Sequence, residues 1–132
     1  MAVKYSNPES MGAPIGAYSH VATGTGKLVS VAGQVGLDGD GNVAEGDLKA
    51  QMAQTFANLT AALESEGIGL SDVLAFTTYL IDADDIARFF EARTELFPEL
   101  FPSGEYPPNT LLVIDRLVKP EFLIEISALA VA

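Results

Sequence analysis

The chain contains no cysteine and only one histidine, His20. The lack of cysteine excludes a disulfide framework, a thiol nucleophile and cysteine-based zinc or iron–sulfur sites. A single histidine cannot build a histidine-rich metal site. We therefore expect no metal centre.

Positive charge is also scarce. Seven Lys and Arg residues stand against 18 Asp and Glu residues, which gives a formal net charge of -11 at pH 7. The average field around such a protein repels polyanions, so nucleic acid is not an expected partner. A ribonuclease would need a local basic patch, and seven basic residues are few to form one.

Long apolar runs are missing as well. No segment has the length of a membrane span, and the first ten residues, M-A-V-K-Y-S-N-P-E-S, lack the apolar core of a signal peptide. We therefore expect a cytoplasmic protein that binds no membrane. A length of 132 residues with 48% hydrophobic content is enough for one domain with a substantial core, and neither repeats nor low-complexity segments interrupt it.

The spacing of apolar residues predicts two helices. The first begins after Asp47, a suitable N-cap, and ends near Gly67. The second follows Asp82, Asp84 and Asp85, whose negative charges suit a helix N-terminus. Pro98 is expected to end or kink this second helix. The apolar stripes of the two helices are Leu48, Met52, Phe56, Leu59 and Leu63, and Ile86, Phe89, Phe90, Leu96, Phe97 and Leu100.

Other apolar runs predict strands. Residues 1–16 are interpreted as an N-terminal arm because they mix Ser, Asn, Pro and Gly without periodicity. The first two strands, separated by a glycine-rich turn, are expected to form a hairpin. The third strand is apolar on both faces, which is typical of a central strand. The expected strands are Tyr18–Thr23, Leu28–Leu37, Val73–Ile81, Thr110–Asp115 and Phe122–Val131.

The last predicted strand is largely apolar on both of its faces. Two helices can cover only one side of the sheet that contains it. The other side should then be buried against something else, most simply another copy of the chain. The sequence therefore predicts a single α+β domain, residues 1–132, that assembles with itself.

Three short segments look like functional motifs but depart from them. Residues 24–27, G-T-G-K, lack the first Gly and the final Ser or Thr of a phosphate loop. Residues 38–42 begin like a calcium loop, but Val and Lys occupy the required positions 43 and 49. Ser19 and His20 are neighbours that point to opposite faces of a strand, and no G-x-S-x-G segment is present, so a hydrolase triad is not expected.

Two residues near the C-terminus do not suit a core. Asn109 follows two prolines at the start of an apolar run, and Glu125 lies between two isoleucines. A carboxylate is costly to bury without a partner. Glu125 could be structural and bind a backbone amide or Arg116, or it could line a cleft and hold or activate a water molecule. Spacing alone favours the structural interpretation.

Four segments carry a family resemblance: P-I-G-A-Y-S-H-V at 14–21, L-V-S-V-A-G-Q-V at 28–35, Q-M-A-Q-T-F-A-N-L at 51–59, and Y-P-P-N-T with the later I-E-I-S-A-L-A. Together they resemble the RidA/YjgF family, also called endoribonuclease L-PSP, from about residue 13 to the end. The resemblance implies a chorismate-mutase-like α+β fold with two helices on one face of a mixed sheet, and a homotrimer with clefts between subunits. It also implies hydrolysis of imines and enamines, with release of ammonia and without a cofactor.

The resemblance implies roles for particular residues. In the family, a Tyr and the backbone of a Ser-Gly-Gln segment line the cleft, and a Glu helps to place water. The matching residues are Tyr18, Gly33, Gln34 and Glu125. Glu125 is thus the expected catalytic residue, and the other three are expected to bind substrate.

The family Arg that grips the substrate carboxylate is replaced by Asn109. A guanidinium fork makes bidentate, charge-assisted bonds that a neutral amide cannot make. Thr110 and Phe90 complete the expected substrate-binding set. Arg88 or Arg93, on the second helix, could replace the missing cation, and the sequence does not decide between them.

The sequence therefore predicts a RidA-like trimer that hydrolyses an imine, an enamine or a related C–N bond of a small metabolite. Because Asn109 replaces the Arg, the substrate is not expected to be a simple carboxylate-bearing imino acid. The alternative is a trimer that binds a small molecule without chemistry, as a metabolite sensor or a scaffold. A ribonuclease is the least favoured hypothesis because of the charge of -11.

Overall fold

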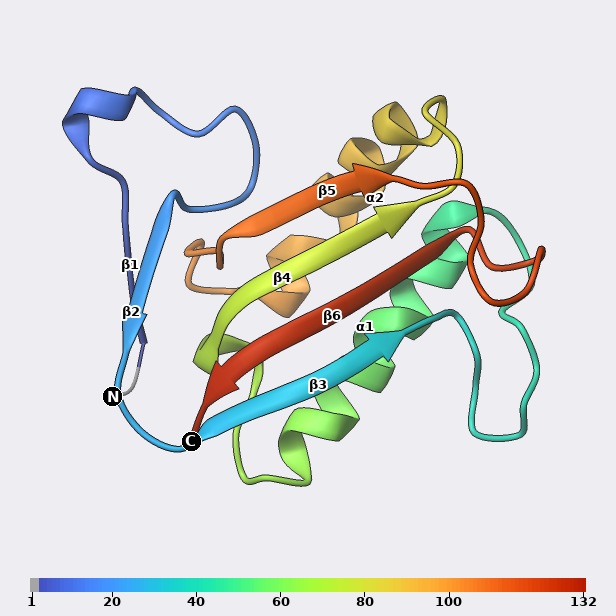
Figure 1. Ribbon diagram of the computed structural model, residues 1–132, viewed down its shortest axis with the longest axis horizontal. Coiled ribbons are helices and arrows are strands. Elements are labelled where there is room, and N and C mark those ends of the chain that lie inside the picture. The colour runs from blue at the N-terminus through green and yellow to red at the C-terminus, as the bar shows by residue number, and fades with distance from the viewer. Residues whose placement is uncertain (1–2) are drawn as a thin grey trace.

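Two helices pack on one face of a four-stranded sheet in the computed structural model, which describes residues 3–132 (Figure 1). A second, two-stranded sheet lies beside it. This architecture is the α+β arrangement predicted from the sequence. In chain order the elements are β1 (Val3–Ser6), η1 (Glu9–Met11), β2 (Val21–Gly24), β3 (Leu28–Gln34), α1 (Leu48–Glu64), η2 (Leu70–Asp72), β4 (Val73–Leu80), α2 (Asp85–Leu100), β5 (Asn109–Val113) and β6 (Ile124–Val131).

Helix α1 follows the predicted apolar spacing. The Asp47 side chain accepts hydrogen bonds from the backbone N–H groups of Lys49 and Ala50, which would otherwise lack partners at a helix start. Beyond the helix, Gly67 has a φ of 76°, and the Ile68 N–H returns to the helix to bond a carbonyl. All five residues of the predicted stripe are buried in the core.

Helix α2 differs from the prediction at two residues. Pro98 lies in the last turn, and the helix ends two residues beyond it, at Leu100. Phe90, expected in the apolar stripe, is 41% exposed. Neither α1 nor α2, the two α-helices of residues 3–132, is long and apolar enough to cross a membrane.

The strand order of the larger sheet is β3-β6-β4-β5. Strand β4 is central, as its apolar character predicts, and it runs antiparallel to β6 and parallel to β5. One face of the sheet packs against both helices, whereas Figure 1 shows the other face without a covering element. That open face carries the exposed apolar side chains of Leu28, Leu112 and Leu129.

The predicted hairpin between residues 18–23 and 28–37 is wrong. Strand β2 pairs instead with β1, which lies inside the expected N-terminal arm, and β3 pairs with β6. The long final strand offers β3 a partner along its length, and backbone hydrogen bonds between Lys27 and Ala132 fix the end of this pair. The Tyr5 hydroxyl donates to the Val73 carbonyl at 2.7 Å, which joins the small sheet to the start of β4.

Candidate functional site

Asn109 begins β5 and points to the helix-covered side of the sheet. It pairs in register with Phe76, a core residue of β4, and residues paired in this way share a face. The buried Thr78 hydroxyl donates a hydrogen bond to Oδ1 of Asn109 at 2.7 Å. Because this bond occupies Oδ1, the Asn109 side chain offers a ligand mainly its NH₂ group.

A small cavity lies beside Asn109, between the sheet and α2. It is narrow: about 240 Å³ of space lies between its atoms, part of it open to solvent, and the centre of a water molecule fits in only about 10 Å³ of this space. Most of its walls are apolar, and its polar groups come from three side chains. The lining residues are Ala17, Phe56, Phe76, Thr78, Phe89, Arg93, Phe97, Pro107 and Asn109.

Arg93 is the cation of this cavity. It is only 4% exposed, and its guanidinium carbon lies 5.0 Å from the ring centre of Phe89 and 4.9 Å from that of Phe90. Within residues 3–132 the guanidinium makes no hydrogen bond or ion pair. Burial lowers the pKa of Arg93, and the nearby Tyr18 and Tyr106 partly oppose this shift. The structure thus places an unpaired buried cation beside Asn109.

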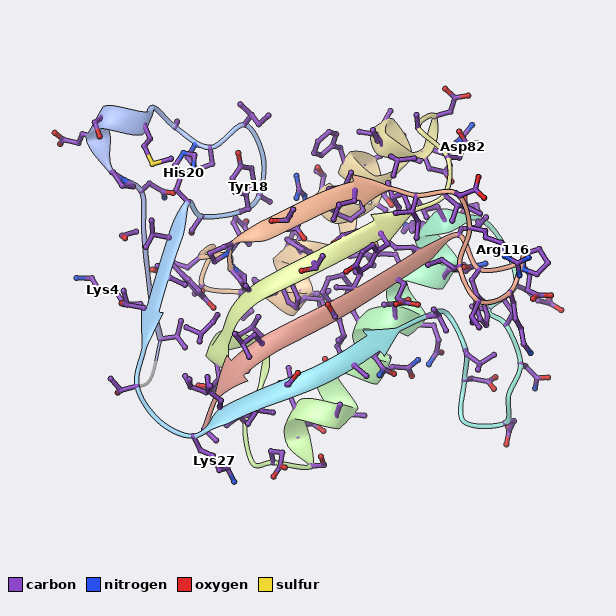
Figure 2. All side chains as sticks on the ribbon, viewed as in Figure 1. Lys4, Tyr18, His20, Lys27, Asp82 and Arg116 are labelled. Carbon is purple, nitrogen blue, oxygen red and sulfur yellow. The ribbon has the colours of Figure 1, made fainter. Side chains whose placement is uncertain are left out.

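The loop before β2 closes over Arg93. A Cβ atom at Gly16 would overlap Nη2 of Arg93, so a larger residue here would displace the guanidinium. Tyr18, two residues later, accepts a 3.5 Å hydrogen bond from the Ile15 N–H. Its ring packs edge-on against His20, with centroids 5.8 Å apart, on the loop seen in Figure 2.

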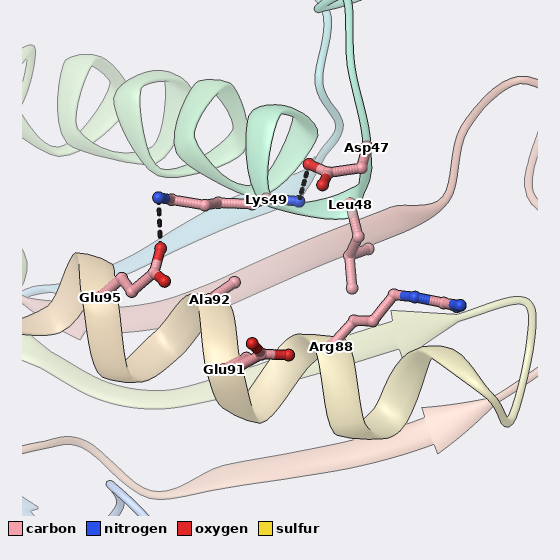
Figure 3. A pocket seen from close by; sticks show the side chains of 7 residues that line it. All are labelled: Asp47, Leu48, Lys49, Arg88, Glu91, Ala92 and Glu95. Carbon is pink, nitrogen blue, oxygen red and sulfur yellow. Dashed lines mark hydrogen bonds and ion pairs between the residues drawn. The ribbon is translucent and has the colours of Figure 1, made fainter.

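Arg88 occupies a different place. It lies five residues before Arg93, about 140° around the helix, in a shallow polar pocket between the start of α1 and α2 (Figure 3). Its Nη1 atom lies 2.8 Å from Oδ1 of Asp85, and its side chain is 60% exposed. Lys49 and Glu95 form an ion pair in the same pocket. Of the two candidate cations, only Arg93 reaches the cavity of Asn109.

Glu125 lies on the open face of the sheet, half-buried and in register with Tyr79. The pairing of β3 with β6 shifts register between Val31 and Gln34, and this irregularity places Gly33 against Glu125. A Cβ atom at Gly33 would overlap the carboxylate. Simple alternation along β3 would place Gly33 on the helix-covered face with Val29 and Val31, because a register shift is not visible in the sequence.

The carboxylate of Glu125 has no hydrogen bond or ion pair within residues 3–132. Arg116, its expected structural partner, instead donates to the backbone carbonyls of Leu117 and Val118. The structural interpretation of Glu125 therefore lacks the partner that it requires. A half-buried carboxylate without a partner is available to a water molecule or a ligand.

The predicted site residues fall into two groups on opposite faces of the sheet. Asn109 and Arg93 share the helix-side cavity, with Phe90 and Tyr18 beside Arg93. Glu125 and Gly33 lie together on the open face. Thr110 follows Asn109 in β5 and therefore points to the opposite side of the sheet, where it is exposed and pairs with Thr77. The Gln34 side chain donates to the Ala32 carbonyl at 3.0 Å. A single chain therefore does not bring Asn109 and Glu125 into one cleft.

Two residues that shape the site, Thr78 and Gly16, were not predicted from the sequence. Thr78 lies within an apolar strand, and nothing marked its hydroxyl as a partner of Asn109. Gly16 is one of several glycines in an irregular segment. A clearer signal existed for Arg93, which lies at i+4 from Phe89 and i−4 from Phe97 and hence in the middle of a buried stripe.

The fold and the sequence define the class of protein. Residues 9–132 match the family described as endoribonuclease L-PSP. The chain therefore belongs to this family, the RidA/YjgF family, as the sequence motifs indicated.

Relatives of known name or structure agree with this assignment. A RutC family protein of Pyrococcus horikoshii is 38% identical over 118 residues, which cover 89% of this chain and 88% of the relative. A 2-iminobutanoate/2-iminopropanoate deaminase of Salmonella typhimurium is 28% identical and covers 93% of both chains. The structure is also similar to the Rid family protein YyfB of Yersinia pestis (29% identity, TM-score 0.87, full coverage of both chains) and to E. coli TdcF with bound serine (25%, 0.72, 98% of each chain).

Proposed function

We propose that this protein hydrolyses an imine, an enamine or a related C–N bond of a small metabolite. The observation that carries the proposal is the half-buried Glu125 carboxylate, which has no partner within residues 3–132 and lies against Gly33. The naming of a similar protein as an imine deaminase supports it. Glu125 would hold and activate the attacking water molecule.

The reaction needs only water and a proton relay. As the water oxygen bonds to the imine carbon, its proton passes to the Glu125 carboxylate, the C=N electron pair moves to nitrogen, and nitrogen takes up this proton. The carbinolamine then collapses: its hydroxyl proton passes through Glu125 to the amino nitrogen, the C–N bond breaks, the C=O bond forms and ammonia leaves. One imine and one water molecule thus give one carbonyl compound and one ammonia, and no cofactor takes part.

A homotrimer would complete the site. The open face of the sheet presents apolar side chains together with Glu125, and a neighbouring copy is the simplest cover for it. If the open face of one copy meets the Asn109 end of the next, Glu125 of one chain and Asn109 of the other come to line one cleft. The separation of these residues within one chain supports such a cleft between subunits.

The proposed substrate is not a simple imino acid. By the family resemblance, Asn109 takes the place of a carboxylate-binding Arg, and it offers one neutral NH₂ group. At the Asn109 position, loss of a charge-assisted bond worth about 1.5–3 kcal/mol weakens the binding of a carboxylate roughly 10- to 100-fold. A cation elsewhere in the cavity would also hold the carboxylate in a different place, which changes the position of the imine carbon.

The test is hydrolysis of 2-iminopropanoate generated in situ, followed by the release of ammonia and keto acid. We expect a rate above spontaneous hydrolysis but about 10- to 100-fold below that of an Arg-bearing relative assayed in parallel. A rate equal to that of the relative would contradict the role given to Asn109. A rate no higher than in buffer, with this and larger imines, would contradict the hydrolase proposal.

Small-molecule binding without chemistry is the second candidate. It is favoured by one observation, the serine bound in the structure of the similar E. coli TdcF. The description of the matching family as endoribonuclease L-PSP favours a ribonuclease, but the distribution of charge opposes it. Lys4, Lys27 and Arg116 lie far apart at the periphery of the molecule (Figure 2), and Lys49 and Arg88 are paired with carboxylates. Arg116 and Lys119 lie close together in the sequence, but two positive charges are few to attract RNA in a protein with a net charge of -11.

A further inference from the structure

Arg93 is a buried cation whose counter-charge is not supplied by residues 3–132. Burying a charge without a partner is costly, so natural proteins seldom keep one without a purpose. All fully buried polar side-chain atoms of the described residues have a partner. The guanidinium nitrogens of Arg93 have no partner, so they are not among the fully buried atoms. They are exposed to the cavity that Asn109 also lines.

We propose that Arg93, together with the NH₂ group of Asn109, binds a carboxylate of the substrate. In this arrangement the cation comes from α2 instead of β5. The description of the ligand as a substrate rests on the proposed function, whereas the binding of a carboxylate does not. The inference concerns the position of the carboxylate: it lies against α2, so the rest of the ligand is oriented differently from a ligand held at the start of β5.

The surroundings of Arg93 hold the guanidinium in place before a ligand arrives. The rings of Phe89 and Phe90 lie about equally far from it, and Gly16 closes the third side. Such packing reduces the side-chain entropy that is lost when a ligand binds. It also explains how the structure retains a guanidinium here without a hydrogen-bond acceptor.

A carboxylate fits this site better than a phosphate. One planar guanidinium presents two parallel N–H groups to two oxygens, and the Asn109 NH₂ group adds a neutral donor. A phosphate dianion would face a single cation in a protein with a net charge of -11.

The test compares Arg93→Met with the matched control Arg88→Met, which removes an exposed Arg from the same helix. The probes are 2-oxobutanoate and its neutral counterpart 2-oxobutanamide, titrated while the arginine Nε–H and asparagine NH₂ signals are followed by NMR. We expect Arg93→Met to weaken 2-oxobutanoate binding about 10- to 100-fold, to the level of the amide, and Arg88→Met to change it less than about twofold. Shifts of the Arg93 and Asn109 signals in the wild type would accompany binding.

A second variant keeps the charge and moves it. Gly16→Ala places a methyl group where Nη2 of Arg93 lies, so it should weaken 2-oxobutanoate binding without removing the cation. Unchanged binding in Arg93→Met would overturn the proposal. Unchanged binding in Gly16→Ala would overturn it as well. So would a smaller assembly mass for Arg93→Met with binding retained, because Arg93 would then be a subunit contact. Carboxylate binding that depends on Arg93, in a protein that hydrolyses no imine, would support this inference and refute the proposed function.

Discussion

Glu125→Gln is expected to lower the rate of C–N hydrolysis by about 10²- to 10⁴-fold, the usual contribution of a general base. Glutamine has nearly the same shape but cannot accept the proton of the attacking water. Binding of 2-oxobutanoate should remain within about twofold of the wild type, because a charge-assisted contact to Arg93 carries it. Steady-state kinetics and an NMR titration measure the two quantities on the same preparations.

Two further variants sharpen this prediction. Glu121→Gln changes an exposed carboxylate just before β6 and should leave the rate unchanged. Gly33→Ala keeps Glu125 but displaces its carboxylate, and it should lower the rate as well. If Glu125→Gln retained more than about a third of the wild-type rate, Glu125 would not be the base that general acid–base catalysis requires.

Gln51→Leu is expected to lower the free energy of unfolding by about 2–3 kcal/mol, since it strands two backbone groups. Gln51 is 3% exposed in α1. Its Nε2 atom donates to the Glu121 carbonyl at 2.8 Å, and its Oε1 atom accepts from the Leu123 N–H at 2.9 Å. Leucine fills the space but bonds neither group. Because these bonds hold the segment that leads into β6, the change should also reduce activity.

Thermal unfolding at a fixed protein concentration measures this effect, and Tm should fall by roughly 10 °C. The matched control is Gln54→Leu, one turn along the same helix. Gln54 bonds only the side chain of Asn58, so its replacement should change stability by no more than about 0.5 kcal/mol. Equal effects of the two substitutions would show that the bonds of Gln51 contribute nothing specific.

The elements with strong local signals were predictable from the sequence. Helix α1 has a regular apolar stripe and an N-cap at Asp47, and both appear in the structure. The central strand β4 was marked by apolar residues on both faces. These patterns are predictable because the spacing of buried residues within one segment indicates its secondary structure without reference to its partners.

Strand pairing was less predictable because it depends on distant partners. The turn at residues 24–27 suggested a hairpin, yet it connects two sheets, since β1 and β6 offer better partners to the strands on either side. The shift between Val31 and Gln34 is likewise a property of the β3–β6 pair. It decides that Gly33 lies against Glu125.

The candidate site was also predictable only in part. Asn109 and Glu125 could be singled out in the sequence as polar residues in apolar runs. That they point to opposite faces of the sheet follows from the register of β4 with β5 and β6. The choice of Arg93 over Arg88 needed the position of each around α2, together with the ion pair that occupies Arg88.

A crystal structure of the protein with bound 2-oxobutanoate tests the account most directly. We predict three copies around one axis, with the ligand carboxylate about 3 Å from the guanidinium of Arg93 and the NH₂ group of Asn109. Glu125 of a neighbouring copy should face the carbonyl carbon of the ligand. A ligand bound away from Arg93, or an Arg93 paired with a protein carboxylate while the ligand lies elsewhere, would contradict it.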